Sequence, residues 1–161
     1  MKRLLSWLLV IICIATIAYF SRQPFSQQDI SPYINKYPAV VKMVKTMPLI
    51  QFHYNTSLID SHANTIGFIQ FIIRKVAHLT IYGLFGLSLL FALQGKRKIN
   101  YKTWLLAGII VLVVASGDEL NQLQNSDRTG CTADVIMDFT GYLIFSTLYL
   151  LIAKLKNEGC Q

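Results

Sequence analysis

The sequence contains few charged residues, and this deficit is its most informative property. Charged residues make up 14% of the 161 residues, against about 25% in an average soluble domain, whereas hydrophobic residues make up 53%. The mean hydropathy is +0.45. A chain of this composition lacks the polar surface that a soluble domain of its size presents to water. It is therefore predicted to be a membrane protein.

Paired cysteines and recognisable catalytic motifs are also missing. The three cysteines have neither the spacing of metal ligands nor that of a disulfide framework. There is no glycine-rich phosphate loop, nucleophile elbow or Cys-x-x-Cys pair in the sequence. The formal charge is +7, but no basic stretch contains interleaved aromatic residues, so a nucleic-acid partner is not predicted. No metal ion or other cofactor is predicted either.

Four apolar runs are long enough to cross a membrane as helices, each of which needs about 20 mainly apolar residues. The predicted spans are residues 4–20, 76–93, 103–118 and 134–153. The third helix can extend through Gln122, and the apolar residues 65–73 can lead directly into the second. We therefore predict an all-α fold, an integral membrane four-helix bundle that residues 1–161 form as a single domain.

The first run and the segment after it need separate interpretation. A secretory signal peptide is the alternative for residues 4–20, but we expect a retained helix because the only tolerable cleavage site, after Ala18, precedes two aromatic residues. All four prolines lie within residues 24–48, so the long connection after the first helix is predicted to hold short helices between breaks. Residues 39–46 are predicted to form two helical turns at the membrane surface.

The distribution of lysine and arginine predicts the orientation in the membrane, because cytoplasmic loops carry an excess of these residues. Eight basic residues near the spans fall on one side and four on the other: Lys2, Arg3, Lys96, Arg97, Lys98, Lys102, Lys154 and Lys156 against Arg22, Arg74, Lys75 and Arg128. Both termini of this multi-pass protein of the cell membrane are therefore predicted to face the cytoplasm. The long connection and residues 117–138 are predicted to face outward.

Polar residues gather where three of the predicted helices reach the outward-facing side. Those that begin the second span share an arc of roughly 100° at 3.6 residues per turn. The third span ends in two acids and an amide, and the fourth begins with two aspartates spaced four residues apart on one face. Charged groups at membrane depth are costly and usually functional. The predicted site comprises Arg74, Lys75, His78, Tyr82, Asp118, Glu119, Gln122, Arg128, Asp134 and Asp138.

Several interpretations of this set remain open, and the residues do not decide whether the chain is an enzyme. The bases and acids can form a purely structural network of ion pairs, in a subunit that binds a protein partner. Alternatively, the site binds an anionic membrane lipid or a cell-wall precursor. The residues assigned to that ligand are Arg74, Lys75, Tyr82, Asp118, Gln122, Arg128 and Asp138. In the enzyme interpretation, acid–base chemistry on a lipid or wall intermediate uses His78, Glu119 and Asp134.

The motifs around these residues resemble those of the VanZ-like family of small bacterial membrane proteins. The matching pieces are Arg74-Lys75-Val76-Ala77-His78 with Tyr82, Asp118-Glu119 with Gln122, and Arg128-Thr129-Gly130 with Asp134, Asp138 and Gly141. Where the family often has a histidine between Asp-Glu and Gln, this chain has Asn121. The resemblance implies a four-span protein of the cell envelope. It also implies a link to low-level resistance to lipid-tailed glycopeptides such as teicoplanin, with which the founding member of the family is associated.

Reporter fusions test the predicted orientation. A reporter fused within residues 94–102 should report a cytoplasmic location, and one within residues 125–130 an external location, because of the asymmetry in basic residues. The measurement pairs alkaline phosphatase, which is active only outside, with a fluorescent protein that matures only inside. Opposite locations at both positions would contradict the orientation and remove the polar residues from the outer side.

Overall fold

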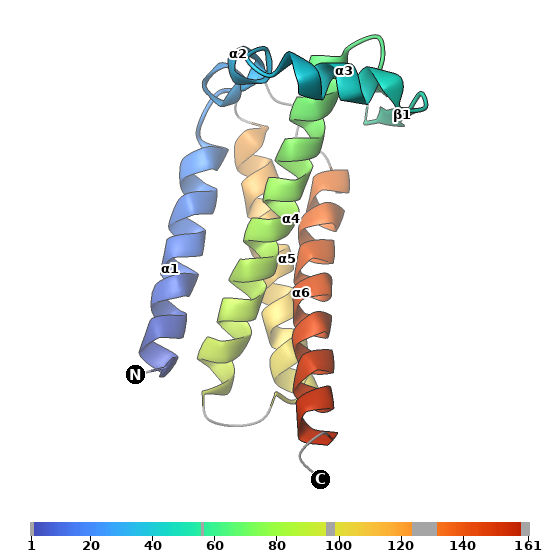
Figure 1. The fold of residues 1–161 in the computed structure, drawn as a ribbon. Coiled ribbons are helices and arrows are strands. Elements are labelled where there is room, and N and C mark those ends of the chain that lie inside the picture. The colour runs from blue at the N-terminus through green and yellow to red at the C-terminus, as the bar shows by residue number, and fades with distance from the viewer. Residues whose placement is uncertain (1, 56, 96–98, 124–131, 159–161) are drawn as a thin grey trace. The chain divides into compact units, whose positions relative to one another are not determined.

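The structure, a computed structural model, describes residues 2–55, 57–95, 99–123 and 132–158 (Figure 1). Within these residues, four helices are long and apolar enough to cross a membrane: Arg3–Ser21, Thr65–Gln94, Tyr101–Gln122 and Thr132–Lys156. They belong to α1 (Lys2–Ser21), α4 (Thr65–Gln94), α5 (Tyr101–Gln122) and α6 (Thr132–Glu158). The predicted all-α membrane fold is thereby confirmed.

The contacts of the chain divide it into two compact units. One, which we call the helix unit, contains Met1–Arg22 and His78–Gln161. The other, which we call the connection unit, contains Gln23–Ala77. Helix α4 is a single helix whose first residues belong to the connection unit and whose remainder belongs to the helix unit.

Helix α4 begins at Thr65, earlier than the predicted span at residue 76. Asn64 caps its N-terminus, because the side-chain oxygen of Asn64 accepts a hydrogen bond from the backbone N–H of Gly67 at 3.0 Å. The apolar residues 65–73, before the basic pair Arg74 and Lys75, therefore continue directly into the membrane helix. The sequence analysis had left this possibility open. Hydropathy alone places the start too late, because the basic pair interrupts the apolar run without interrupting the helix.

The connection unit holds short elements, as the prolines predict. They are the 3₁₀ helix η1 (Phe25–Gln28), α2 (Ser31–Ile34), α3 (Pro38–Thr46), β1 (Gln51–Tyr54) and β2 (Ser57–Asp60). The two strands pair antiparallel, with Tyr54 opposite Ser57. This hairpin was not predicted, because four-residue strands carry little periodicity and the turn lacks glycine; Asn55 takes a φ of 53°, which asparagine tolerates.

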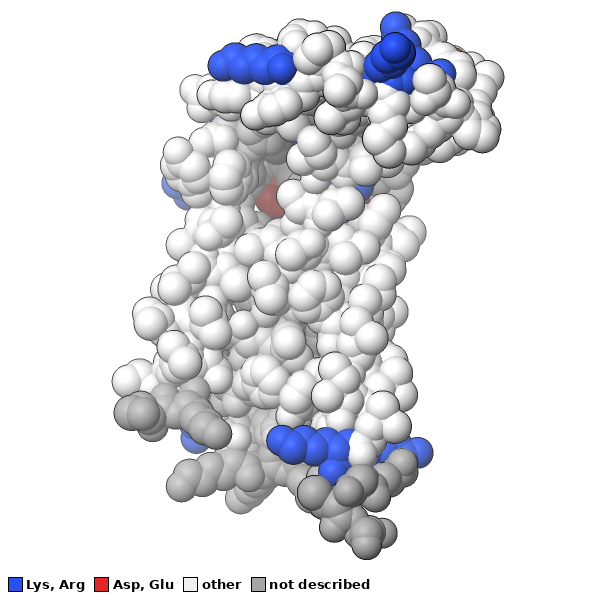
Figure 2. Space-filling view, in the orientation of Figure 1, with Lys and Arg blue, Asp and Glu red and all other residues white. Residues whose placement is uncertain are grey.

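The parts of α1, α4, α5 and α6 in the helix unit lie side by side (Figure 1). Their shared core is apolar and includes the fully buried Phe85, Leu90, Val111 and Tyr142. The exposed faces of these helices are apolar as well, as expected of helices surrounded by lipid. Val113, for example, is 66% exposed. In Figure 2, basic side chains lie at the end where α1 begins and α6 ends and also on the connection unit, and the faces of the membrane helices are largely uncharged.

Helices α4 and α6 approach each other closely at Gly141. A Cβ atom added to Gly141 would collide with the backbone oxygen of Leu79, which belongs to α4 and cannot rotate away as a side chain can. Glycine at this position therefore lets the two helix backbones touch. Gly117 of α5 provides a comparison, because a Cβ atom added there would meet nothing within 4 Å.

Replacing Gly141 by alanine should destabilise the helix unit by about 1–3 kcal/mol, because the added methyl group forces α4 and α6 apart. The measurement is the free energy of unfolding in mixed detergent micelles. Gly117→Ala is the matched control and should leave that free energy unchanged or slightly higher, since alanine favours helix. Equal stabilities of the two variants would show that the close approach contributes nothing.

Candidate functional site

Carboxyl and amide side chains are buried at the end of the helix unit where α5 ends and α6 begins. Helix α5 contributes Asp118, Glu119 and Gln122, and α6 contributes Asp134 and Asp138. The Asp118 residue is 8% exposed and Asp138 is 0% exposed. Gln122 lies four residues after Asp118, and Asp138 lies four residues after Asp134. Residues at this spacing share one helix face, so each helix presents its polar side chains together. Acids that would be solvated at a helix end in water are here enclosed.

Two side chains of α4 make hydrogen bonds with two of these acids, Asp118 and Asp138. Nδ1 of His78 lies 3.1 Å from Oδ1 of Asp138, and the hydroxyl of Tyr82 donates to Oδ2 of Asp118 at 3.0 Å. The His78 and Tyr82 rings are stacked, with centroids 6.3 Å apart and an angle of 19° between the planes. The imidazole and the phenol, one turn apart on α4, thus bond to carboxylates from two different helices.

Each of these two carboxylates retains an oxygen atom that accepts no hydrogen bond from the residues that the structure describes. Within the described residues, Oδ1 of Asp118 and Oδ2 of Asp138 are buried and accept no hydrogen bond. An unsatisfied buried acceptor costs about 1–3 kcal/mol, and more when it is charged. The cluster therefore has acceptor capacity that the described side chains do not use.

The end of α1 is attached to the same cluster by residues that the sequence analysis did not assign. Ser21 is buried, and its hydroxyl donates to the backbone oxygen of Asp118 at 3.5 Å. The amide of Asn121 donates to the Ser21 oxygen at 2.8 Å. Asn121 occupies the position where the VanZ-like motif often has histidine, and that departure was the one available signal. Its role here is to hold α1 against α5.

The predicted basic residues are placed differently. Arg74 and Lys75 belong to the connection unit, where each lies over an aromatic ring. The Arg74 guanidinium is 5.5 Å from the centroid of Phe25, and the Lys75 ammonium is 4.2 Å from that of Tyr54. Arg128 lies outside the described residues. Of the predicted site, the structure joins His78 to Asp138 and Tyr82 to Asp118, with Glu119, Gln122 and Asp134 buried on the same two helices.

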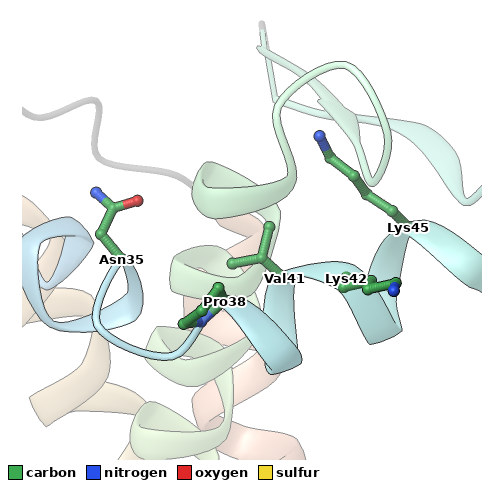
Figure 3. Close-up of a pocket in the computed structure, with 5 residues that line it drawn as sticks. All are labelled: Asn35, Pro38, Val41, Lys42 and Lys45. Atoms are coloured by element: carbon green, nitrogen blue, oxygen red, sulfur yellow. The ribbon is translucent and has the colours of Figure 1, made fainter.

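The connection unit also has a pocket of about 300 Å³, but its lining is unlike the cluster (Figure 3). It is lined by Asn35, Pro38, Val41, Lys42 and Lys45. Both lysines come from α3, are exposed, and direct their ammonium groups apart. Polar groups that do not converge cannot fix the orientation of a ligand, so the buried cluster of the helix unit is the better candidate site.

The same cluster contains a set of side chains suited to a metal ion. His78, Asp118 and Asp138 each offer one ligand atom, and these atoms lie within 4.8 Å of one another. An imidazole with carboxylates is a common ligand set for divalent transition metals. The sequence analysis did not predict a metal, because one histidine without a dense motif gives little signal.

One protein-family model, described as VanZ/LLP1, matches residues 6–153 of the chain. The match includes every residue of the predicted site and extends over most of all four membrane helices. No match was found in comparisons with curated proteins or with solved structures.

Replacing Tyr82 by phenylalanine should destabilise the helix unit by about 1.5–3 kcal/mol, the usual contribution of a hydrogen bond to a charged group. The ring remains, but the Asp118 carboxyl loses the hydroxyl that donates to its Oδ2. The readout is the free energy of unfolding in mixed micelles. Tyr101→Phe, at a position 72% exposed, is the control and should change nothing. A Tyr82 variant as stable as the control would mean that the bond does not stabilise the fold.

Proposed function

Since the chain belongs to the VanZ/LLP1 family, we propose that it is a cell-envelope membrane protein whose buried cluster binds a lipid headgroup. The headgroup belongs to an anionic membrane lipid or to a lipid-linked cell-wall precursor. Family membership agrees with the resemblance of the motifs. The observation that carries the proposal is the burial of Asp118 and Asp138, with the half-buried His78 in contact with Asp138, at one end of an apolar helix unit. Ionisable groups at membrane depth face a bundle interior or a water-filled cavity, and usually serve function.

The chemistry of the residues favours a headgroup that carries both phosphate and hydrogen-bond donors. Asp118 and Asp138 are acceptors, so they suit the hydroxyl or amino groups of a headgroup. Arg74 and Lys75, which were assigned to the ligand from the sequence, carry the positive charge that suits a phosphate. Lipid headgroups and lipid-linked sugars share this combination. We propose that the site faces outward, with both termini in the cytoplasm.

Contribution to glycopeptide resistance is the cellular part of the proposal. A protein that sequesters or presents a lipid-linked precursor changes how a lipid-tailed glycopeptide reaches its target in the same membrane. The resemblance to the VanZ-like family, whose founding member is associated with teicoplanin resistance, motivates this part. Glycopeptides without a lipid tail should be affected less, because they do not concentrate in the membrane.

Expression of the chain in a susceptible Gram-positive host should raise the inhibitory concentration of teicoplanin more than that of an untailed glycopeptide. Asp138→Asn removes the buried carboxylate and should abolish the increase. Gly117→Ala is the control: its added methyl group meets no neighbouring atom within 4 Å, so the increase should be retained. Membrane levels of each variant are measured by immunoblot.

In parallel, native mass spectrometry of the purified protein with phosphatidylglycerol or a lipid-linked wall precursor identifies the ligand. No shift in resistance and no retained lipid of either kind would overturn the proposal.

Acid–base catalysis is a second candidate, favoured by the contact between His78 and Asp138. A carboxylate that bonds one imidazole nitrogen orients the ring and leaves the other nitrogen for proton transfer. The structure pairs the histidine with Asp138, whereas the sequence analysis assigned Glu119 and Asp134 as its catalytic partners. His78→Ala distinguishes the candidates: loss of the cellular effect with lipid binding intact supports catalysis, and loss of lipid binding supports recognition. Tolerance of Arg74→Lys would support loose electrostatic binding.

A further inference from the structure

We propose that His78, Asp118 and Asp138 together bind one divalent transition-metal ion. Their ligand atoms come from α4, α5 and α6 and lie within 4.8 Å of one another. The three ligands belong to the cluster proposed to bind the headgroup, but metal binding does not depend on a headgroup, since the ion is bound by the protein alone. It also goes beyond the sequence analysis, which predicted no metal.

The unused oxygen atoms give the first argument. Oδ1 of Asp138 contacts His78, and Oδ2 of Asp118 accepts from Tyr82, so each carboxyl has one oxygen with a partner. The second oxygen of each is buried and has no partner in the described part of the chain. Both residues are more than nine-tenths buried. A cation between the two carboxylates would provide these oxygens with a partner.

Charge gives the second argument. Two ionised aspartates buried in an apolar helix unit carry two negative charges, and an isolated buried carboxylate is strongly disfavoured. Among the contacts of the described residues, Tyr82 donates a hydrogen bond but no charge, and a protonated His78 offsets one negative charge at most. A divalent ion with neutral His78 offsets both. The imidazole then coordinates through the lone pair of Nδ1, and its proton resides on Nε2.

The distances are compatible with coordination after a small movement. Zinc binds nitrogen and carboxylate oxygen at about 2.0–2.2 Å, so two ligand atoms on one ion are at most about 4.4 Å apart. Atoms already within 4.8 Å reach that separation by small changes in side-chain torsion angles. Three protein ligands leave a coordination position for water or another oxygen atom. Tyr82, by its bond to Asp118, orients one of the ligands.

The ligand set favours a transition metal over magnesium or calcium. Imidazole nitrogen suits zinc, iron and nickel, whereas magnesium and calcium take ligand sets made of oxygen alone. We therefore use Zn²⁺ as the probe and Mg²⁺ as its comparison. Two other histidines, His53 and His62, lie in the connection unit and provide a control for adventitious binding.

The test uses the full-length protein, purified in detergent without a histidine tag and treated with a chelator. Titration with Zn²⁺ in a calorimeter should show one ion per chain, and Mg²⁺ should bind far more weakly. Asp118→Asn, Asp138→Asn and His78→Gln should each raise the dissociation constant by at least about tenfold. The double variant His53→Gln, His62→Gln should retain the one ion.

Tyr82→Phe serves as a variant that keeps all three ligands. It should raise the dissociation constant by about tenfold to a hundredfold, because the Asp118 carboxyl loses the hydroxyl that orients it. If the wild-type protein binds no Zn²⁺, or if only the His53, His62 double variant loses it, the proposal is overturned. Failure of headgroup binding leaves this result untouched, because no lipid takes part in the titration.

Discussion

The burial of the Asp138 carboxyl is the constraint on which the helix unit depends. This side chain has no exposure, and the contact with His78 at 3.1 Å stabilises it. The contact also holds α4 against α6. Gly141 lies three residues beyond Asp138, and Leu79 follows His78, so the polar contact and the close approach of the two backbones are neighbours. A side chain as short as aspartate can reach across only because the helices touch there.

The membrane helices could be predicted from the sequence because the length and apolar composition of a segment are enough to identify such a helix. The boundary of α4 could not, since Arg74 and Lys75 lower the local hydropathy, whereas the helix continues through them from Thr65. Packing against Phe25 and Tyr54 accommodates these cations, and such contacts have no signature in a hydropathy profile. The hairpin was missed for a related reason: its strands pair with each other across one short turn, and neither has a clear alternation of apolar and polar residues.

The gathering of acids near His78 could be anticipated from the sequence, whereas the pairs that they form could not. Helical spacing places His78 with Tyr82 and Asp134 with Asp138, and the order of the spans brings the ends of α4, α5 and α6 to one side. Which acid meets the histidine depends on the rotation and relative height of two helices, and a single sequence does not contain that information. The contact between Ser21 and Asn121 is of the same kind. Neither residue is charged, so nothing in its type marks it as part of the cluster.

The attachment of α1 to α5 has a consequence for synthesis at the ribosome. Ser21 and Asn121 are 100 residues apart in the chain. At about 5–20 residues per second, roughly 5–20 s separate the emergence of the two residues, and during this interval the first helix has no α5 to pack against. Val10 and Cys13, which are later buried, must then tolerate surrounding acyl chains on every side. The hydroxyl of Thr16 bonds to the backbone oxygen of Ile12 at 2.8 Å, so this polar group is satisfied within the helix before any partner arrives.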